Sequence, residues 1–166
     1  WQRSVVRRTA SFVQADLDEI TSKSPFLQRT LPCQNVLAYF DRSEINTGKL
    51  LGRGGFSVVY EIVAFELDEN LSNRLVHEYQ AIREQFAATA IDPTNGRGRY
   101  VIKHLQEYLL NKQTEFSLAA SDLALEAAYL SRMEHPHILR LQGFSATGLD
   151  ALENGQHDGY FLIVDR

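Results

Sequence analysis

The sequence predicts an α+β fold, with an antiparallel five-stranded sheet, one main helix against it and another helix inserted between strands two and three. Three observations predict it. Short runs rich in β-branched and aromatic residues, bounded by glycine and polar residues, are typical of strands. Two longer segments space their apolar residues three or four positions apart, as along one face of a helix. The elements follow the order strand, strand, helix, strand, helix, strand, strand, which suits one sheet with a helix packed on it.

The first two predicted strands, residues 50–52 and 58–63, flank a glycine turn. A long insertion, residues 66–99, follows them. Its apolar residues step by four, four, three and four, which predicts an amphipathic helix; they are Leu71, Leu75, Tyr79, Ile82 and Phe86. Turn residues at 92–96 end this helix. Because the apolar stripe must be buried, we expect the insertion to pack on its own domain, with a groove for a partner as the alternative.

The third predicted strand covers residues 100–102. The main helix is expected from Thr114, a candidate cap, to about Met133, and it ends before Pro136 because the residue preceding a proline disfavours helical angles. Residues 138–144 and 160–164 are the last two predicted strands. The segment between them, residues 146–158, is expected to be a polar loop.

Composition limits the classes of protein to consider. The chain has 166 residues, of which 44% are hydrophobic, and 17 basic against 21 acidic side chains give a net charge of −4. This size suits one domain, and the charge provides no general attraction for nucleic acid. No apolar run approaches the roughly 18 residues of a membrane helix, so we expect no membrane segment. The single cysteine, Cys33, favours a reducing, cytoplasmic or otherwise intracellular location.

The N-terminal part differs from the remainder. Residues 1–44 are expected to be an extension or linker, and residues 45–166 the folded domain. Arg3, Arg7 and Arg8 precede any acidic residue, and a solvated arm is the simplest interpretation of 1–24, with a basic functional tail or the end of a transit peptide as alternatives. Because the chain starts at Trp1, we expect it to be a piece of a longer protein.

A glycine-rich turn is the first feature with chemical meaning. It consists of Gly52, Arg53, Gly54, Gly55, Phe56 and Ser57. Without a Cβ, glycine lets backbone N–H groups approach phosphate oxygens, although many such runs are ordinary hairpins. A dinucleotide-binding fold needs a helix after the glycines, and a Walker loop needs a terminal Gly-Lys-Ser/Thr. Here a strand follows, which is the arrangement of a protein-kinase nucleotide flap.

Two charged residues complete the pattern. Lys103 follows the third predicted strand, and it is either a strand end at the solvent boundary or an ammonium positioned for phosphate. Glu126 falls inside the apolar arc of the main helix, where a carboxylate is costly to bury unless it is paired. An arc-edge glutamate that reaches solvent is the alternative. The arc also contains Phe116, Ala119, Ala120, Leu123, Ala127, Leu130 and Met133. Lys103 is the expected partner of Glu126.

Together these features resemble the small lobe of a eukaryotic protein kinase, over residues 45–166 and ending at the hinge. Residues 51–60, Leu-Gly-Arg-Gly-Gly-Phe-Ser-Val-Val-Tyr, resemble the glycine-rich loop, and residues 100–103, Tyr-Val-Ile-Lys, resemble the third-strand Val-Ala-Ile-Lys. Glu126 resembles the C-helix glutamate. Residues 135–138, His-Pro-His-Ile, resemble the entry to strand four, and residues 161–166 resemble strand five and the hinge. Residues 139–144 are similar to the tyrosine-kinase-like branch.

The resemblance implies transfer of the ATP γ-phosphoryl group to protein Ser/Thr hydroxyls, and less to Tyr, with ATP and a protein substrate as partners. It implies that Lys103 binds the α- and β-phosphates while paired with Glu126, under the amides of 52–57, with Phe56 at the flap tip. Leu51 and Val59 would enclose the adenine. The remaining adenine-pocket positions would be Val101, in place of the usual alanine, the gatekeeper Val164, and the backbone of Asp165 in the hinge.

The family's catalytic loop and the Asp-Phe-Gly site that holds Mg²⁺ would follow Arg166, so no metal ligand is expected in this sequence, and the piece itself is expected to be inactive. Ser57 stands where a third glycine is common, which would stiffen the flap slightly. A pseudokinase-type interaction module that catalyses nothing is the alternative function, and a structural α+β domain with chance motif matches is a third.

Overall fold

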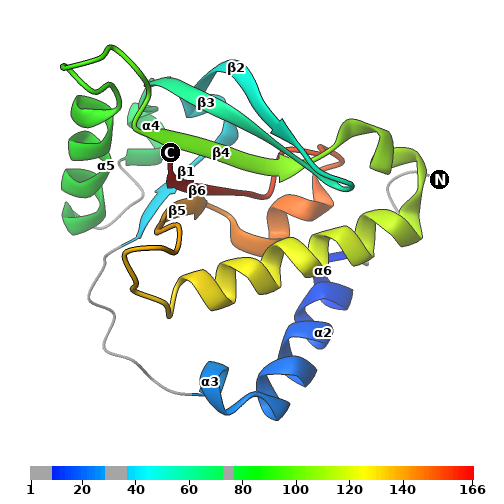
Figure 1. Ribbon diagram of the computed structural model, residues 1–166. Coiled ribbons are helices and arrows are strands. Elements are labelled where there is room, and N and C mark those ends of the chain that lie inside the picture. Colours follow the sequence, from blue (N-terminus) through cyan, green and yellow to red (C-terminus); the bar gives the residue numbers. More distant parts are fainter. Residues whose placement is uncertain (1–8, 29–36, 73–76) are drawn as a thin grey trace.

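A computed structural model describes residues 9–28, 37–72 and 77–166 (Figure 1). The predicted α+β class is confirmed, but the sheet has six strands in the order β1-β5-β6-β4-β3-β2. The strands are β1 (Ala38–Phe40), β2 (Ile45–Arg53), β3 (Ser57–Phe65), β4 (Tyr100–Leu105), β5 (Leu141–Ser145) and β6 (Phe161–Asp165). Five of them pair in antiparallel fashion, and they correspond to the five predicted strands.

The prediction of a purely antiparallel five-stranded sheet is wrong because β1 joins the sheet parallel to β5. Ala38 lies opposite Gly143, and both Ala38 and Phe40 are buried. The two backbones approach so closely that a Cβ on Gly143 would lie 2.4 Å from the Ala38 carbonyl oxygen. Glycine at this position is therefore what admits the sixth strand.

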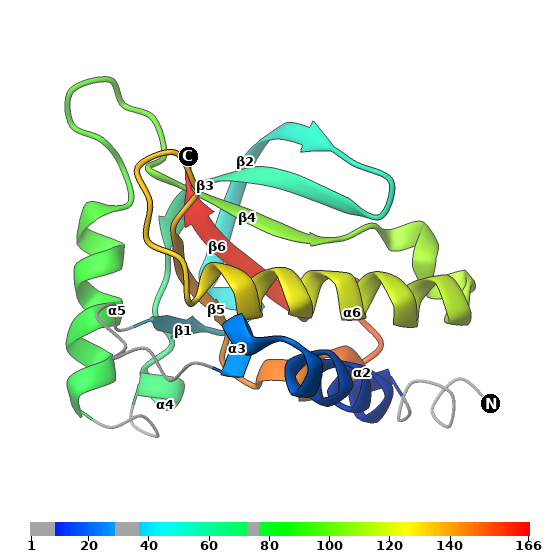
Figure 2. The same cartoon turned by 60° about the horizontal axis from the view of Figure 1, so that its bottom comes forward.

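The main helix, α6 (Gln113–Leu130), lies across one face of the sheet (Figure 2). It buries Phe116, Ala120 and Leu123 in a core that includes Leu162 and Val164 of the central strand β6. Alternate residues of a strand point to opposite faces, so Phe161 and Ile163 enter a second core on the other face. The helix is three residues shorter than expected at its C-terminal end, where Ser131 is the C-cap.

The N-terminal segment folds onto α6, so the expectation of a solvated arm is wrong for its described part. Helix α2 (Thr9–Lys23) and the short helix α3 (Pro25–Gln28) lie along α6 (Figure 2). Val13 is fully buried in the same core as α6. Thr9 Oγ1 accepts a hydrogen bond from Gln113 Nε2 at 2.9 Å, and the Phe26 ring stacks on Tyr129 at 5.8 Å. The two contacts join the segment to both ends of α6.

The insertion between β3 and β4 packs on the sheet as expected, although it contains two helices, α4 (Glu69–Ser72) and α5 (His77–Thr89). Phe86 and Ala90 enter the second core, whereas Leu75 lies outside the described residues. The predicted turn at 92–96 is confirmed: the Gly96 N–H donates to the Asp92 carbonyl, and Gly96 has a φ of 68°.

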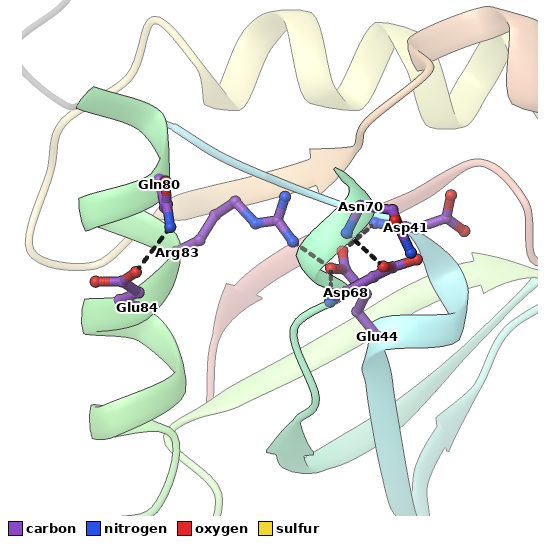
Figure 3. A network of polar contacts seen from close by, with 7 residues as sticks. All are labelled: Asp41, Glu44, Asp68, Asn70, Gln80, Arg83 and Glu84. Carbon is purple, nitrogen blue, oxygen red and sulfur yellow. Dashed lines mark hydrogen bonds and ion pairs between the residues drawn. The ribbon is translucent and has the colours of Figure 1, made fainter. Parts of the chain in front are cut away.

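A buried polar network fixes α5 to the sheet (Figure 3). Arg83 of α5 reaches across to Glu44, which ends the 3₁₀ helix η1 (Arg42–Glu44), and their side chains are 0% and 1% exposed. The other bonds of the Glu44 carboxylate come from the backbone N–H groups of Asp41 and Asp68, both at 2.7–2.8 Å. The Arg83 guanidinium also lies 5.5 Å from the centre of the Phe40 ring.

Two connections complete the fold. The 3₁₀ helix η2 (Glu107–Asn111) links β4 to α6. The segment 146–158, expected to be a polar loop, contains the 3₁₀ helix η3 (Gly148–Glu153), which buries Ala151 and Leu152 against α2 and α6. β5 starts at Leu141 rather than 138, since Ile138 and Leu139 are exposed. In the described part of the chain, no helix has the length and apolar character needed to cross a membrane.

Candidate functional site

The centre of the site is an ion pair between the sheet and α6. Lys103 lies on β4 between the buried Val101 and Leu105, so its side chain leaves the sheet on the same face as theirs. Its Nζ lies 2.5 Å from Oε2 of Glu126, which is on the sheet-facing side of α6. The pairing expected from the sequence is therefore present, and neither charge is left without a partner.

This ion pair is accessible from solvent. The Lys103 and Glu126 side chains are 25% and 38% exposed, in contrast to the fully buried Arg83–Glu44 pair. A charged ligand can reach the ammonium, since the pair occupies the edge of the core rather than its interior. A lysine ammonium has three N–H donors, so the bond to Glu126 leaves donor capacity for an incoming anion.

The glycine-rich turn joins β2 to β3, next to β4, and its Gly54 N–H donates to the Ser57 carbonyl at 2.8 Å. Among the described residues, no contact requires glycine at positions 52 and 55. Their φ angles are not positive, and a Cβ on either would meet no atom within 4 Å. Gly98 differs, because a Cβ there would lie 2.1 Å from the Ile62 carbonyl oxygen. Gly52 and Gly55 therefore leave open space beside the turn, and packing does not explain why these residues are glycines.

Two residues that sequence reasoning missed hold this turn. Gln106 Nε2 donates to the carbonyls of Gly54 and Gly55 at 2.8 and 3.0 Å, and the Tyr108 hydroxyl donates to Gly55 at 2.8 Å. Arg53 in turn donates to Gln106 Oε1 at 3.0 Å. No motif marks Gln106 or Tyr108, since each lies more than fifty positions from the glycines along the chain. Only the strand pairing of β3 with β4 brings them together.

The expected adenine-pocket residues share one face of the sheet. Val59 pairs in register with Lys103, and Val101 pairs with Val164. Val101 and Val164 are 5% and 4% exposed, and Val59 is partly buried, all in the core beneath α6. They belong to the apolar core next to the ammonium.

Two of the predicted positions are less enclosed. Leu51 and Phe56 are 38% and 44% exposed. The Asp165 N–H donates to the Arg140 carbonyl at 3.2 Å, and its carboxylate accepts from Gln142 Nε2 at 2.6 Å. The Asp165 N–H is therefore used within the fold, and Leu51 and Phe56 project from the flap rather than into a core.

In the part of the chain that the structure describes, no group of three or more His, Cys, Asp or Glu side chains could hold a metal ion. No protein-family model and no curated protein matches this chain.

Proposed function

We propose that this chain is the ATP-binding lobe of a protein kinase, which transfers the γ-phosphoryl group of ATP to Ser/Thr hydroxyls of a protein substrate. The observation that carries the proposal is the 2.5 Å contact between Lys103 on the sheet and Glu126 on the packed helix, next to a glycine-rich hairpin. A lysine held in this way is a point charge for phosphate oxygens, and its glutamate partner keeps it aimed.

The base and the phosphates of a nucleotide each have candidate contacts among the described residues. A flat base would pack against the apolar side chains of Val59, Val101 and Val164, and Lys103 lies beside them. No contact with a described residue explains the glycines at positions 52 and 55, which supports a role in the close approach of phosphates to the backbone. ATP, when bound, supplies the phosphoryl group. Its Mg²⁺ would take protein ligands from a large lobe, which is also where a catalytic base would be supplied.

Nucleotide affinity tests the proposal directly. We expect the chain to bind a fluorescent ATP analogue in competition with ATP, and Lys103→Met to weaken this binding about tenfold or more, since an ion-assisted hydrogen bond contributes about 1.5–3 kcal/mol. Glu126→Gln should weaken it by a smaller factor because the ammonium remains. Lys23→Met is the matched control, since Lys23 is on the outer side of α2 and its side chain is 71% exposed.

Equal affinity in the wild type and Lys103→Met would contradict the role of Lys103, and no nucleotide binding at all would overturn the proposal. A longer protein that includes a large lobe should phosphorylate a generic protein substrate and lose this activity with Lys103→Met. Nucleotide binding without any phosphotransfer in that longer protein would instead support the pseudokinase alternative.

A further inference from the structure

We propose that Gln106 and Tyr108 form a latch that presets the glycine-rich hairpin, so that the N–H groups of Gly55 and Phe56 are turned outward to receive a phosphate chain. The inference rests on the proposed function and adds two positioning residues to it. The latch consists of three side-chain hydrogen bonds to two consecutive carbonyls, those of Gly54 and Gly55, at 2.8–3.0 Å.

The Gln106 side chain is held in the orientation that the latch requires. Gln106 is 7% exposed, and its Oε1 accepts a hydrogen bond from Arg53. This bond directs the amide NH₂ toward the two carbonyls. Its own backbone N–H donates to the Phe56 carbonyl at 2.9 Å and extends the β3–β4 ladder by one bond. Gln106 therefore contacts three consecutive residues of the turn at once.

Because the peptide unit is planar, holding a carbonyl also fixes the direction of the N–H group in the same unit. The Gly54 carbonyl and the Gly55 N–H belong to one planar trans peptide, as do the Gly55 carbonyl and the Phe56 N–H, so in each unit the two groups point in opposite directions. Because both carbonyls face the latch, both N–H groups face away from it. Neither N–H donates a hydrogen bond within the described part of the chain. Consecutive outward N–H groups of this kind form an anion-binding concavity.

The ligand class follows from the charges and the space around this concavity. The turn that carries the oriented N–H groups leads into β3, which pairs with β4, and Val59 of β3 lies opposite Lys103 of β4. A Cβ at position 55 would meet nothing within 4 Å, which leaves the approach open. An extended polyphosphate matches two N–H donors and one cation better than a single phosphate does. The latch thus favours the triphosphate over the nucleoside part of a ligand.

The test compares binding of ATP, tripolyphosphate and adenosine to the chain and its variants. We expect Gln106→Ala to weaken the binding of ATP and of tripolyphosphate about tenfold, and Tyr108→Phe to weaken it about threefold, since each lost bond should cost about as much as one net hydrogen bond. The affinity for adenosine should change less than twofold. A general loss of folding would weaken adenosine as well. Tyr108 is 42% exposed, so Tyr108→Phe tests the latch without disturbing the core. Matched controls are Tyr129→Phe and Gln80→Ala, which lie on α6 and α5.

A second measurement needs no ligand. Backbone ¹⁵N relaxation should give lower order parameters for the N–H groups of Gly55 and Phe56 in Gln106→Ala than in the wild type and the two controls. Unchanged order would overturn the latch, as would lost order with unchanged tripolyphosphate affinity. Wild-type ATP binding that depends on Lys103 but not on Gln106 or Tyr108 would overturn the latch and leave the proposed function standing. Failure of the wild type to bind either ATP or tripolyphosphate would overturn both.

Discussion

Arg83 and Glu44 form an ion pair that water does not reach, although 39 positions of sequence separate them. Glu44 is satisfied by two backbone N–H groups besides Arg83, whereas Nε and Nη1 of Arg83 have no hydrogen-bond partner in the described structure. A buried charge pair of this kind contributes little net stability, but either charge alone is costly. The pair therefore fixes where the insertion docks more than how stably the domain folds.

Removal of one charge should be far more harmful than removal of both. We expect Arg83→Met to lower the free energy of unfolding by about 3–5 kcal/mol, because Glu44 is left buried without its counter-ion. Adding Glu44→Leu should recover part of this loss. Urea denaturation measures both, with Arg140→Ala as the control, since its pair with Glu134 is 45% and 57% exposed and should cost under about 1 kcal/mol. A double variant less stable than Arg83→Met would contradict this account.

The glycines should separate into structural and functional groups. Gly143→Ala should destabilise the fold by about 1–3 kcal/mol, because its Cβ would overlap the Ala38 carbonyl and force β1 from the sheet. Gly55→Ala should change the unfolding free energy by less than about 0.5 kcal/mol while weakening nucleotide binding. Thermal denaturation and nucleotide titration of the same two proteins check both halves. Equal stability losses would argue against the distinction.

The packing of α2 on the core can be tested by shortening one buried side chain of this helix. Val13 of α2 is fully buried in the core, and Val13→Ala should lower the free energy of unfolding by about 1.5–3 kcal/mol. Phe12→Ala is the control, since Phe12 is larger but 45% exposed on the outer side of the same helix. A greater loss from Phe12→Ala than from Val13→Ala would show that α2 packs by another face.

Acid should weaken the fold partly through His104. Burial lowers the pKa of this imidazole, against the weaker opposite effects of the Leu105 carbonyl and Asp158. In the unfolded chain the His104 imidazole has a pKa near 6.5, so below that pH it binds more protons in the unfolded state than in the folded state. The free energy of unfolding therefore falls as the pH drops from about 6.5 toward the pKa of the folded state. Above pH 7 the contribution is constant.

Replacing this histidine should therefore flatten the pH dependence. Urea denaturation at pH 7.5 and 5.5 should show a smaller loss of stability in His104→Gln than in the wild type. His137→Gln, which replaces an exposed histidine, is the control for the substitution itself. An identical slope in His104→Gln would mean that His104 is equally protonated in the folded and unfolded states.

The ion pair at the site could be foreseen because its two halves follow local rules. Glu126 interrupts an apolar helix arc and therefore needs a partner, and Lys103, at the end of an apolar strand pattern, is the natural candidate. The flap could be foreseen because glycine composition is a local signal. By the same reasoning the five antiparallel strands follow from runs of β-branched and aromatic residues, and the helix of the insertion follows from the spacing of its apolar residues. Their roles in binding ATP stay predictions.

What the sequence concealed depends on distant contacts. Three residues, Ala38–Phe40, are too few to show a period, and their parallel pairing with Leu141–Ser145 crosses a hundred positions. Helix α2 buries few of its side chains, so its apolar face is too narrow to distinguish from an exposed helix or arm. Gln106 carries no motif at all. Each of these features is decided by tertiary packing and not by local preference.

Because α6 lies between the sheet and α2, its two sides are not independent. Thr9 is tied to Gln113 at one end and Phe26 to Tyr129 at the other. An outward swing of α6 that parts Glu126 from Lys103 must either carry the N-terminal helices along or break both ties. The two N-terminal helices, within residues 9–28, are thus mechanically coupled to a carboxylate about a hundred positions later.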